Sequence, residues 1–380
     1  EILQRAVNLT MPRFPTYKAA IRKGVFWRYL EPNDRPGPFV QEDVKNPCQP
    51  MHFKGNNRYL VRIYYYRNRI ALEAHHSLGD GTGGMCVLQT LTATYLRLKG
   101  HSEIENGGFV LDILGIPDPG ELEDAYMKYA NAKVCPPRPG EKTYRVRGTK
   151  EPFYTLNIID GIMSVSEVMR VAKSYNATIT EYLNSVLLYA LMQKQESLKL
   201  RPVKIAMPVN LRRFFPSRTL RNFITMIYPG IDPRLGEYTF EEIVTQVHNY
   251  MRYYLNEKLL RGDITTNAET QRNPFIRIVP LFIKDLVVRQ FYTKIQDKNS
   301  SAGLTNMGAL KVPETMKPYI ERFDIYMGQP FSTRTNCAIA SFEDILTINF
   351  ASSIAETDVE RLFFRKLVQD GIHVKIESNR

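Results

Sequence analysis

Alternating apolar and polar positions predict a β-hairpin in the first quarter of the chain. Residues 59–66 and 69–76 each alternate with a period of two, and a two-residue turn separates them. Alternation over 24–30 predicts a further strand, and apolar residues spaced three and four apart predict a helix from about 83 to 98. The first part of the chain is therefore expected to combine strands with a helix.

Four capping boxes predict the helices of the second half. In each, a serine or threonine is followed three residues later by a glutamate, just before an apolar periodic run. The four capping residues are Ser164, Thr178, Thr239 and Thr357. The last helix is expected to end at Gly371, since glycine commonly follows the final helical residue. Apolar or β-branched runs predict strands at 153–159, 202–209, 222–229, 335–342 and 345–350, the last two joined as a hairpin.

Glycine and proline interrupt the pattern between the two halves. They are frequent over 100–150, above all in the run Cys135-Pro136-Pro137-Arg138-Pro139-Gly140, as expected of a connection. We therefore predict two subdomains, at 1–145 and 146–380. Because both halves mix hairpins with helices, the predicted fold class is mixed α/β (α+β) and not a regular strand–helix repeat.

Composition and charge narrow the class of protein. The chain has 380 residues and is 43% hydrophobic, which is enough for a large core and excludes a disordered protein. No apolar window is long enough to span a membrane, the first residues lack the apolar core of a signal peptide, and the four cysteines are far apart. We therefore expect a cytoplasmic protein without structural zinc or disulfides.

The net charge of +12 indicates either an anionic partner or simply a solvated basic surface. No zinc-finger, basic-zipper or RRM signature accompanies it, so we predict that nucleic acid is not a partner. A phosphate-bearing small molecule or an acidic carrier protein would use the same charge.

One glycine-rich segment between the predicted hairpin and helix carries the clearest chemical signal. Its sequence is His75-His76-Ser77-Leu78-Gly79-Asp80-Gly81-Thr82-Gly83-Gly84, with two of the six histidines of the chain. Loops that leave a rigid scaffold in this way often carry function. Four interpretations compete.

Two of these interpretations lack their required context. The spacing Gly79-x-Gly81-x-x-Gly84 matches a dinucleotide-binding loop, but the preceding strand is the second arm of a hairpin and not the first strand of a parallel sheet. His76 and Asp80 have the i, i+4 spacing of metal ligands on a helix, yet the segment leaves a strand and no His/Cys cluster supplies a third ligand. We therefore predict no metal site.

The other two interpretations stay open. In one, the histidines are core residues and the glycines only turn the chain, although four glycines around an aspartate exceed what a turn needs. In the other, His76 is a general base. It shares a strand face with Ile70, Leu72 and Ala74, whereas His75 points to the opposite face. A histidine held at a strand end beside open space suits proton abstraction from a bound nucleophile.

The segment also resembles the HHxxxDG signature of the chloramphenicol acetyltransferase-like superfamily, which includes nonribosomal peptide condensation domains and wax ester synthases. The likeness runs over nearly the whole chain and is greatest to bacterial alcohol acetyltransferase family proteins. Four stretches carry it: Glu31-x-Asn33-Asp34-Arg35-Pro36, His76-Ser77-Leu78-Gly79-Asp80-Gly81-Thr82-Gly83, Met207-Pro208-Val209-Asn210-Leu211-Arg212 and Thr305-Asn306-x-Gly308. Thr305 stands where the family usually has serine, and the absent D-F-G-W-G element argues against the plant-type subgroup.

The resemblance implies a fold and a reaction. The two halves would form a V with a tunnel at their interface, and the first strand would precede Glu1, so a segment upstream is expected. His76, buried in the tunnel, would deprotonate an acceptor hydroxyl or amine, which attacks an acyl thioester without an acyl-enzyme. Thr305 or Asn306 would donate to the tetrahedral oxyanion.

Three further residues would support the site. Asp80 would pair with an arginine across the fold, for which Arg212 is the candidate, and Gly81 would let the turn close behind the histidine. We thus expect an O-acyltransferase that moves an acyl group such as acetyl from acyl-CoA, as co-substrate, to an alcohol, with no tightly bound cofactor. The alternatives are amide-forming condensation from a carrier-protein thioester and a non-catalytic binding domain of the same fold.

Overall fold

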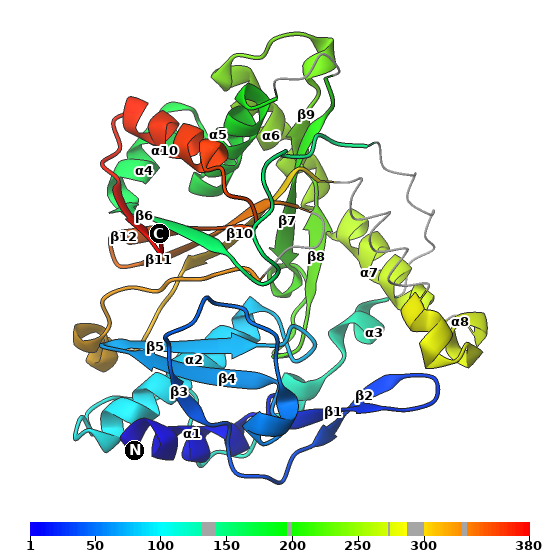
Figure 1. The fold of residues 1–380 in the computed structure, drawn as a ribbon, viewed down its shortest axis with the longest axis vertical. Coiled ribbons are helices and arrows are strands. Elements are labelled where there is room, and N and C mark those ends of the chain that lie inside the picture. Colours follow the sequence, from blue (N-terminus) through cyan, green and yellow to red (C-terminus); the bar gives the residue numbers. More distant parts are fainter. Residues whose placement is uncertain (131–141, 196–199, 273, 287–299, 329–332) are drawn as a thin grey trace.

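The computed structural model describes residues 1–130, 142–195, 200–272, 274–286, 300–328 and 333–380, and it has two lobes (Figure 1). The elements of the smaller lobe are α1 (Ile2–Thr10), β1 (Ala19–Lys23), β2 (Arg28–Pro32), β3 (Val40–Glu42), β4 (Val61–Tyr66), β5 (Arg69–Ala74), α2 (Gly81–Leu98) and α3 (Ala125–Tyr129). Strands β3, β4 and β5 form one sheet, and β1 and β2 form a separate hairpin. Helix α2 packs on both α1 and β5, so one face of the β3–β4–β5 sheet is covered by helices.

The larger lobe contains most of the second half of the chain. Its elements are β6 (Asn157–Ser164), α4 (Val165–Ser174), α5 (Ile179–Gln193), β7 (Val203–Asn210), β8 (Ile224–Ile227), β9 (Gly230–Ile231), α6 (Phe240–Tyr254), α7 (Glu257–Arg272), α8 (Pro274–Ile278), β10 (Ala302–Ala309), β11 (Thr335–Phe342), β12 (Ile345–Ser352), α10 (Asp358–Gln369) and β13 (Lys375–Ser378). Short 3-10 turns include η3 (Pro119–Leu122), η4 (Leu211–Arg213) and η6 (Glu314–Tyr319).

A mixed sheet is the centre of the larger lobe. Its strand order is β13-β6-β12-β11-β10-β7-β8, with β9 also paired to β7. Strand β10 runs parallel to β7 and β11, and the other pairs are antiparallel. Helices α4, α5, α6 and α10 cover one face, where they and the strands bury a large apolar cluster (Figure 1). The expected mixed α/β class is confirmed.

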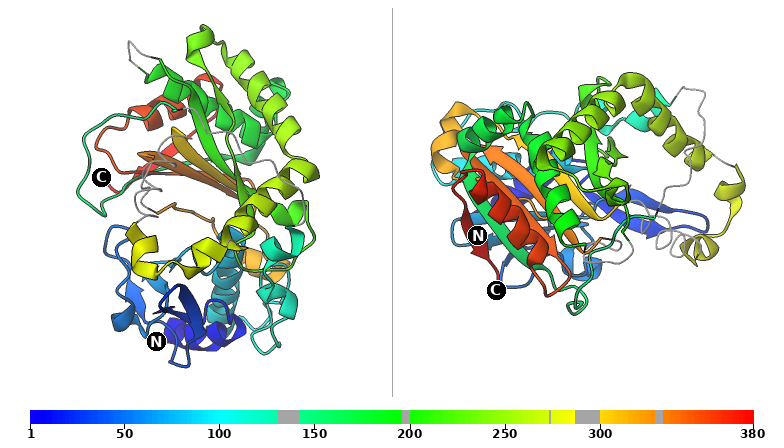
Figure 2. Two further views of the ribbon diagram at one scale, coloured as in Figure 1. Left: turned by 90° about the vertical axis from the view of Figure 1, so that its right-hand side faces the viewer. Right: turned by 90° about the horizontal axis from the view of Figure 1, so that it is seen from above.

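Segments far apart in sequence cross between the lobes. Near η6, Val312 and Met316 from the second half join Ala93 of α2 in one buried cluster. Residues 274–286 also extend to the β1–β2 hairpin, where the Leu281 N–H donates to the Val25 carbonyl (2.8 Å) (Figure 2). The division between 1–145 and 146–380 stays a prediction. The proline-rich run 135–140 on which it depends lies outside the described residues.

The two predicted hairpins are confirmed. Strands β4 and β5 pair from Val61–Ala74 to Tyr66–Arg69, and the turn between them places Arg67 at φ 50°. Strands β11 and β12 pair over their whole length around Glu343, also at φ 50°. The predicted helix at 83–98 is α2, and Gly371, at φ +82°, follows the end of α10 as expected.

Other predicted bounds are wrong for local reasons. Residues 24–30 are not one strand, because the Gly24 N–H donates to the Trp27 carbonyl (2.8 Å) and the chain reverses between β1 and β2. The predicted strand at 153–159 begins only at Asn157, after Tyr154 at φ 65°. These apolar runs include turn residues that alternation alone does not distinguish from strand.

Two of the four capping boxes form completely, at Thr178 and Thr239. Ser164 accepts the Glu167 N–H, but the Glu167 carboxylate accepts instead from the His373 N–H (2.9 Å). Thr357 makes no side-chain cap. A competing tertiary partner thus replaces the local bond that the spacing predicts at Ser164.

Candidate functional site

The segment that links β5 to α2 is a tight turn ended by a helix cap. Asp80 is the N-cap residue of α2, and its Oδ1 accepts the backbone N–H groups of Thr82 (3.1 Å) and Gly83 (3.3 Å). Aspartate is a favoured N-cap because its carboxylate satisfies N–H groups that have no partner within the helix. Leu78 of the same turn is fully buried in the apolar cluster of the smaller lobe.

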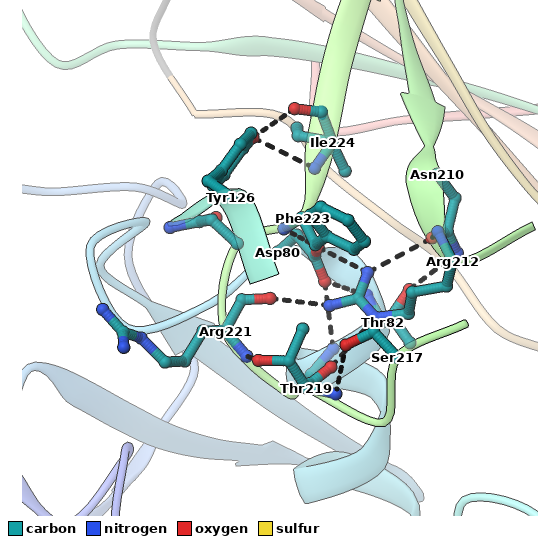
Figure 3. A network of polar contacts seen from close by, with 12 residues as sticks. Asp80, Thr82, Tyr126, Asn210, Arg212, Ser217, Thr219, Arg221, Phe223 and Ile224 are labelled. Atoms are coloured by element: carbon teal, nitrogen blue, oxygen red, sulfur yellow. Dashed lines mark hydrogen bonds and ion pairs between the residues drawn. The ribbon is translucent and has the colours of Figure 1, made fainter. Parts of the chain in front are cut away.

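Asp80 also forms the ion pair that was expected with Arg212. Its Oδ2 accepts from Arg212 Nη1 (2.7 Å) and from the Phe223 N–H (2.9 Å) (Figure 3). The side chains of Asp80 and Arg212 are only 2% and 11% exposed. Each Asp80 oxygen therefore already accepts two hydrogen bonds.

Arg212 extends this contact to the loop that precedes β8. Its Nη1 also donates to the Asn210 side chain (3.2 Å), its Nε to the Thr219 carbonyl (2.9 Å), and its Nη2 to the Arg221 carbonyl (2.6 Å) (Figure 3). A planar guanidinium with several fixed donors suits this bridging role. Arg212 thereby holds residues 217–223 of the larger lobe against the turn of the smaller lobe.

The same loop is tied to the smaller lobe at other points. The Leu220 N–H donates to the Glu121 carbonyl (2.9 Å), and Glu121 itself receives a bidentate bond from the buried Arg13 (2.7 and 2.8 Å). The Asn222 side chain donates to the His76 carbonyl (2.7 Å). The backbone of His76 is therefore held directly by a residue of the other lobe.

The glycines of the turn are required by packing and not by backbone conformation. A Cβ on Gly79 or Gly83 would lie 2.5 or 2.2 Å from the Leu220 carbonyl oxygen, and 2.5 or 2.6 Å from the Tyr17 hydroxyl. A Cβ on Gly81 would meet only the flexible Met307 side chain. None of these glycines has a positive φ. Packing thus requires glycine most clearly at Gly79 and Gly83, and the supporting role expected for Gly81 stays a prediction.

Both histidine side chains of the turn are exposed. His75 Nδ1 lies 2.9 Å from the Ser77 hydroxyl and accepts the Ser77 N–H (3.3 Å); desolvation and then the neighbouring His76 lower the pKa of His75. Within the described residues the His76 imidazole has no hydrogen-bond partner. The expectation of a buried His76 is therefore wrong: its backbone is fixed while its imidazole remains accessible.

Thr305 and Asn306 lie on opposite faces of β10. Asn306 donates through Nδ2 to the Thr180 hydroxyl (2.8 Å), and its Oδ1 accepts the Gly308 N–H (2.7 Å). Both ends of this amide are thus used within the fold. Thr305 is on the face shared with Met307, whose side chain adjoins Gly81 at the start of α2. Of the two, Thr305 is the one that faces the smaller lobe.

The sheet face toward the smaller lobe is covered at one end and open at the other. Over β11 and β12 it is buried beneath residues 320–328, where the Thr347 hydroxyl donates to the Phe323 carbonyl (2.8 Å). Over β7, β8 and β10 the alternate residues are only partly covered: Lys204, Ala206, Pro208, Asn210, Met226, Gly303, Thr305 and Met307. The α2 start reaches this strip, since Asn210 donates to the Thr82 hydroxyl (3.3 Å).

Several residues that hold the turn in place lie outside the motif at 75–84, and the sequence pattern did not predict them. Tyr17 is buried with no hydrogen-bond partner for its hydroxyl within the described residues, and burial raises its pKa. Asn222 and Leu220 belong to a loop without a distinctive pattern. Asn210 alone had a signal, since it lies in the Pro208-Val209-Asn210-Leu211-Arg212 stretch.

Two kinds of feature are absent from the described residues, a cluster of metal ligands and a membrane-spanning helix. No group of three or more His, Cys, Asp or Glu side chains there could hold a metal ion. No helix in that part of the chain is long and apolar enough to cross a membrane.

No protein-family model and no curated protein matches the chain significantly. Solved structures do match over nearly its whole length. Polyketide synthase associated protein 5 from Mycobacterium tuberculosis is 14% identical with a TM-score of 0.60, covering 97% of this chain and 89% of that one. F. sporotrichioides TRI101, complexed with coenzyme A and T-2, is 11% identical with a TM-score of 0.56, covering 98% and 91%.

A condensation domain gives a similar match. The first condensation domain of the calcium-dependent antibiotic synthetase is 16% identical with a TM-score of 0.55, covering 98% of this chain and 90% of that one. Likeness at such low identity concerns the fold. This chain therefore shares its two-lobed mixed α/β fold with these three solved structures.

Proposed function

We propose that this chain is an acyltransferase of the bacterial alcohol acetyltransferase kind, which moves an acyl group from acyl-CoA to an alcohol hydroxyl. The observation that carries this proposal is the combination at His76 of a fixed backbone and an accessible imidazole. A general base must reach the proton that it abstracts while its own position is fixed. Arg212 bonds both to Asp80 and to the Thr219 carbonyl, and these contacts help to hold the turn that carries His76 in a fixed position.

The proposed reaction needs no covalent enzyme intermediate. The His76 imidazole takes the hydroxyl proton as the alcohol oxygen attacks the thioester carbonyl carbon. The C–S bond of the resulting tetrahedral intermediate then breaks, the acyl group remains on the alcohol oxygen, and the proton on His76 passes to the departing thiolate. Such base catalysis contributes about 10²–10⁴ in rate.

Thr305 is our candidate for stabilising the tetrahedral oxyanion. Its position on the β10 face toward the smaller lobe supports this role, and the Asn306 amide is already used by Thr180 and Gly308. A hydroxyl donor that strengthens its bond as charge develops on oxygen lowers the barrier. Thr305→Ser should then retain most activity, and Thr305→Val should lower kcat.

The donor assignment rests on charge and on one structural comparison. TRI101, which has the same fold, is complexed with coenzyme A. The net charge of +12 would attract the phosphates of the same nucleotide thioester. The partly covered strip over β7, β8 and β10 is lined mainly by short or apolar side chains and ends beside the start of α2, which supports it as the path of the acyl chain.

A second candidate is amide formation from a carrier-protein thioester. The fold likeness to a condensation domain favours it, and the base at His76 would act on an amine in the same way. A non-catalytic binding domain is the third option, and no contact among the described residues favours it specifically.

A panel of acyl-CoA donors and alcohol or amine acceptors, scored by thiol release and by mass of the product, tests the proposal. We expect an ester product that disappears with His76→Ala. Amide formed only from an acylated carrier protein would replace the first candidate by the second. No turnover with any donor, together with tight binding of acyl-CoA, would indicate the binding domain.

A further inference from the structure

An apolar arm projects from one side of the molecule. It consists of residues 19–32, which form the β1–β2 hairpin, and residues 274–286, and the two segments extend together beyond the lobes (Figures 1 and 2). Among the described side chains of the arm, nine large apolar ones are exposed: Val25, Phe26, Trp27, Tyr29, Leu30, Ile278, Phe282, Ile283 and Leu286. Val25, Ile278 and Phe282 are 72%, 68% and 74% exposed. Several large apolar side chains exposed on one projecting part of a molecule are typical of an interaction site.

Specific bonds join the two segments into one unit. Arg28 forms a bidentate pair with Asp285 (2.7 and 2.6 Å). The Lys284 ammonium lies 3.5 Å from the Trp27 ring centroid and donates to the Phe26 carbonyl (3.0 Å). The hairpin tip is thus held in position with its apolar side chains outward, and it is not a loose end.

Positive charge accompanies the apolar surface. The two segments contain five basic residues and two acidic ones. The acidic residues, Glu31 and Asp285, are paired with Arg22 and Arg28. Among the described residues, Lys23 and Arg277 have exposed side chains and no ion-pair partner.

We propose that this arm binds the surface of a lipid bilayer that contains anionic lipids. Its apolar tip would enter the boundary between headgroups and acyl chains, and its lysines and arginines would contact the headgroups. A projecting tip suits insertion into a bilayer, and the excess positive charge complements anionic headgroups. The proposal is independent of acyl transfer, because binding is measured without any substrate.

Trp27 is the only tryptophan of the chain, so its fluorescence reports on the arm directly. We expect vesicles of phosphatidylcholine with phosphatidylserine to shift its emission to shorter wavelength and to co-sediment the full chain. Vesicles of phosphatidylcholine alone should bind more weakly, and added salt should weaken the binding to anionic vesicles.

Two variants separate the apolar and the charged contributions while keeping Trp27. Phe26→Ser with Phe282→Ser should weaken binding to both vesicle types by at least about tenfold. Lys23→Gln with Arg277→Gln should weaken binding to anionic vesicles by about 25-fold, because each basic residue contributes about fivefold, and should leave neutral vesicles unaffected. Lys99→Gln with Arg252→Gln removes the same charge outside the arm and should have little effect.

Absence of vesicle binding by the wild-type chain would overturn the proposal. An equal loss with the Lys99 and Arg252 control would do so as well, since net charge alone would then explain binding. If the Phe26 and Phe282 variant instead dissociates a dimer in light scattering and binds vesicles as before, the arm is a self-association surface. Circular dichroism should show that every variant is folded, as expected for changes at exposed side chains.

Discussion

Asp80 and Arg212 are 132 positions apart in the sequence, and their side chains lie 2.7 Å apart between the two lobes. The pair is almost completely buried, and each partner makes further hydrogen bonds. A buried ion pair of this kind contributes little net stability over an apolar pair, but loss of one partner leaves an uncompensated charge. The contact therefore fixes the relative position of the β5–α2 turn and residues 217–223.

Loss of either partner should cost nearly as much as loss of both. We expect Asp80→Ala and Arg212→Ala each to lower the free energy of unfolding by about 3–5 kcal/mol. The double variant should lose no more than the worse single variant, as denaturant unfolding of all three would show. The matched control is Arg218→Ala. Arg218 lies in the loop 217–223 and forms an exposed ion pair with Asp118, so its loss should change the free energy of unfolding little. Additive losses would show that the two residues act independently.

The glycines at the start of α2 should respond in opposite ways to alanine. Gly83→Ala places a Cβ 2.2 Å from the Leu220 carbonyl oxygen, and we expect it to destabilise the fold by about 1–3 kcal/mol. Gly84→Ala meets no atom within 4 Å and should stabilise α2 by about 0.5–1 kcal/mol, the usual difference between these residues in a helix. Thermal unfolding of the two variants measures both effects. Equal shifts would mean that Leu220 and Tyr17 do not constrain the turn.

The two adjacent histidines should differ in their effect on activity. On the proposed function, His76→Ala should lower turnover by about 10²–10⁴ with little change in melting temperature, since its imidazole is exposed. His75→Ala should lower turnover much less, because His75 Nδ1 is engaged locally with Ser77. Thiol release with the best donor of the panel compares them. A greater loss with His75→Ala would reverse the assignment of the base.

Glu360 should make stability depend on pH. Its side chain lies in the core, one carboxylate oxygen has no hydrogen-bond partner among the described residues, and burial raises the pKa of this carboxyl to about 7. The folded state therefore binds this proton more tightly than the unfolded state. This tighter proton binding adds to the free energy of unfolding. The added free energy is fully present at pH values below the usual glutamate pKa, and it is lost as the pH rises through about 7.

Replacement of Glu360 by glutamine should remove this dependence. We compare the free energy of unfolding of Glu360→Gln with that of wild type. The difference in favour of the variant should increase between about pH 4.5 and pH 8, by at most about 3 kcal/mol. Denaturant unfolding across that range gives the difference, and the exposed Glu321→Gln is the control. A gain that does not vary with pH would mean that Glu360 titrates normally.

Salt should weaken the interaction with an acyl-CoA donor. The attraction between exposed charges falls as the Debye length shrinks from about 10 Å at 0.1 M salt to about 3 Å at 1 M. We expect the KM for acyl-CoA to rise with salt, and an acyl-pantetheine without the nucleotide to show a higher KM with little salt dependence. Steady-state kinetics at several salt concentrations compare the two donors. An equal response of both would contradict a role for the basic surface.

Local pattern in the sequence determined much of the fold. Alternation predicted the β4–β5 hairpin and the spacing of apolar residues predicted α2, because burial of one face imposes a period of two on strands and about 3.6 on helices. Continuous apolar or β-branched runs predicted the β11–β12 hairpin, whose strands are buried on both faces. The motif at 75–84 marked the turn as the candidate site. Its pairing with Arg212 was expected only from a family resemblance, since no local spacing relates residues 132 positions apart.

The tertiary structure alone decided which residues of the motif matter and how. Gly79 and Gly83 are constrained by Tyr17, which lies in the chain just before β1, and by Leu220, which lies in a distant loop. The apolar run at 24–30 is a projecting hairpin and not a core strand, because its turn is set by one backbone bond and its outward face has no covering element in the described part of the chain. Periodicity reports that a side chain is apolar, but only the packing of the remaining chain determines whether anything covers it.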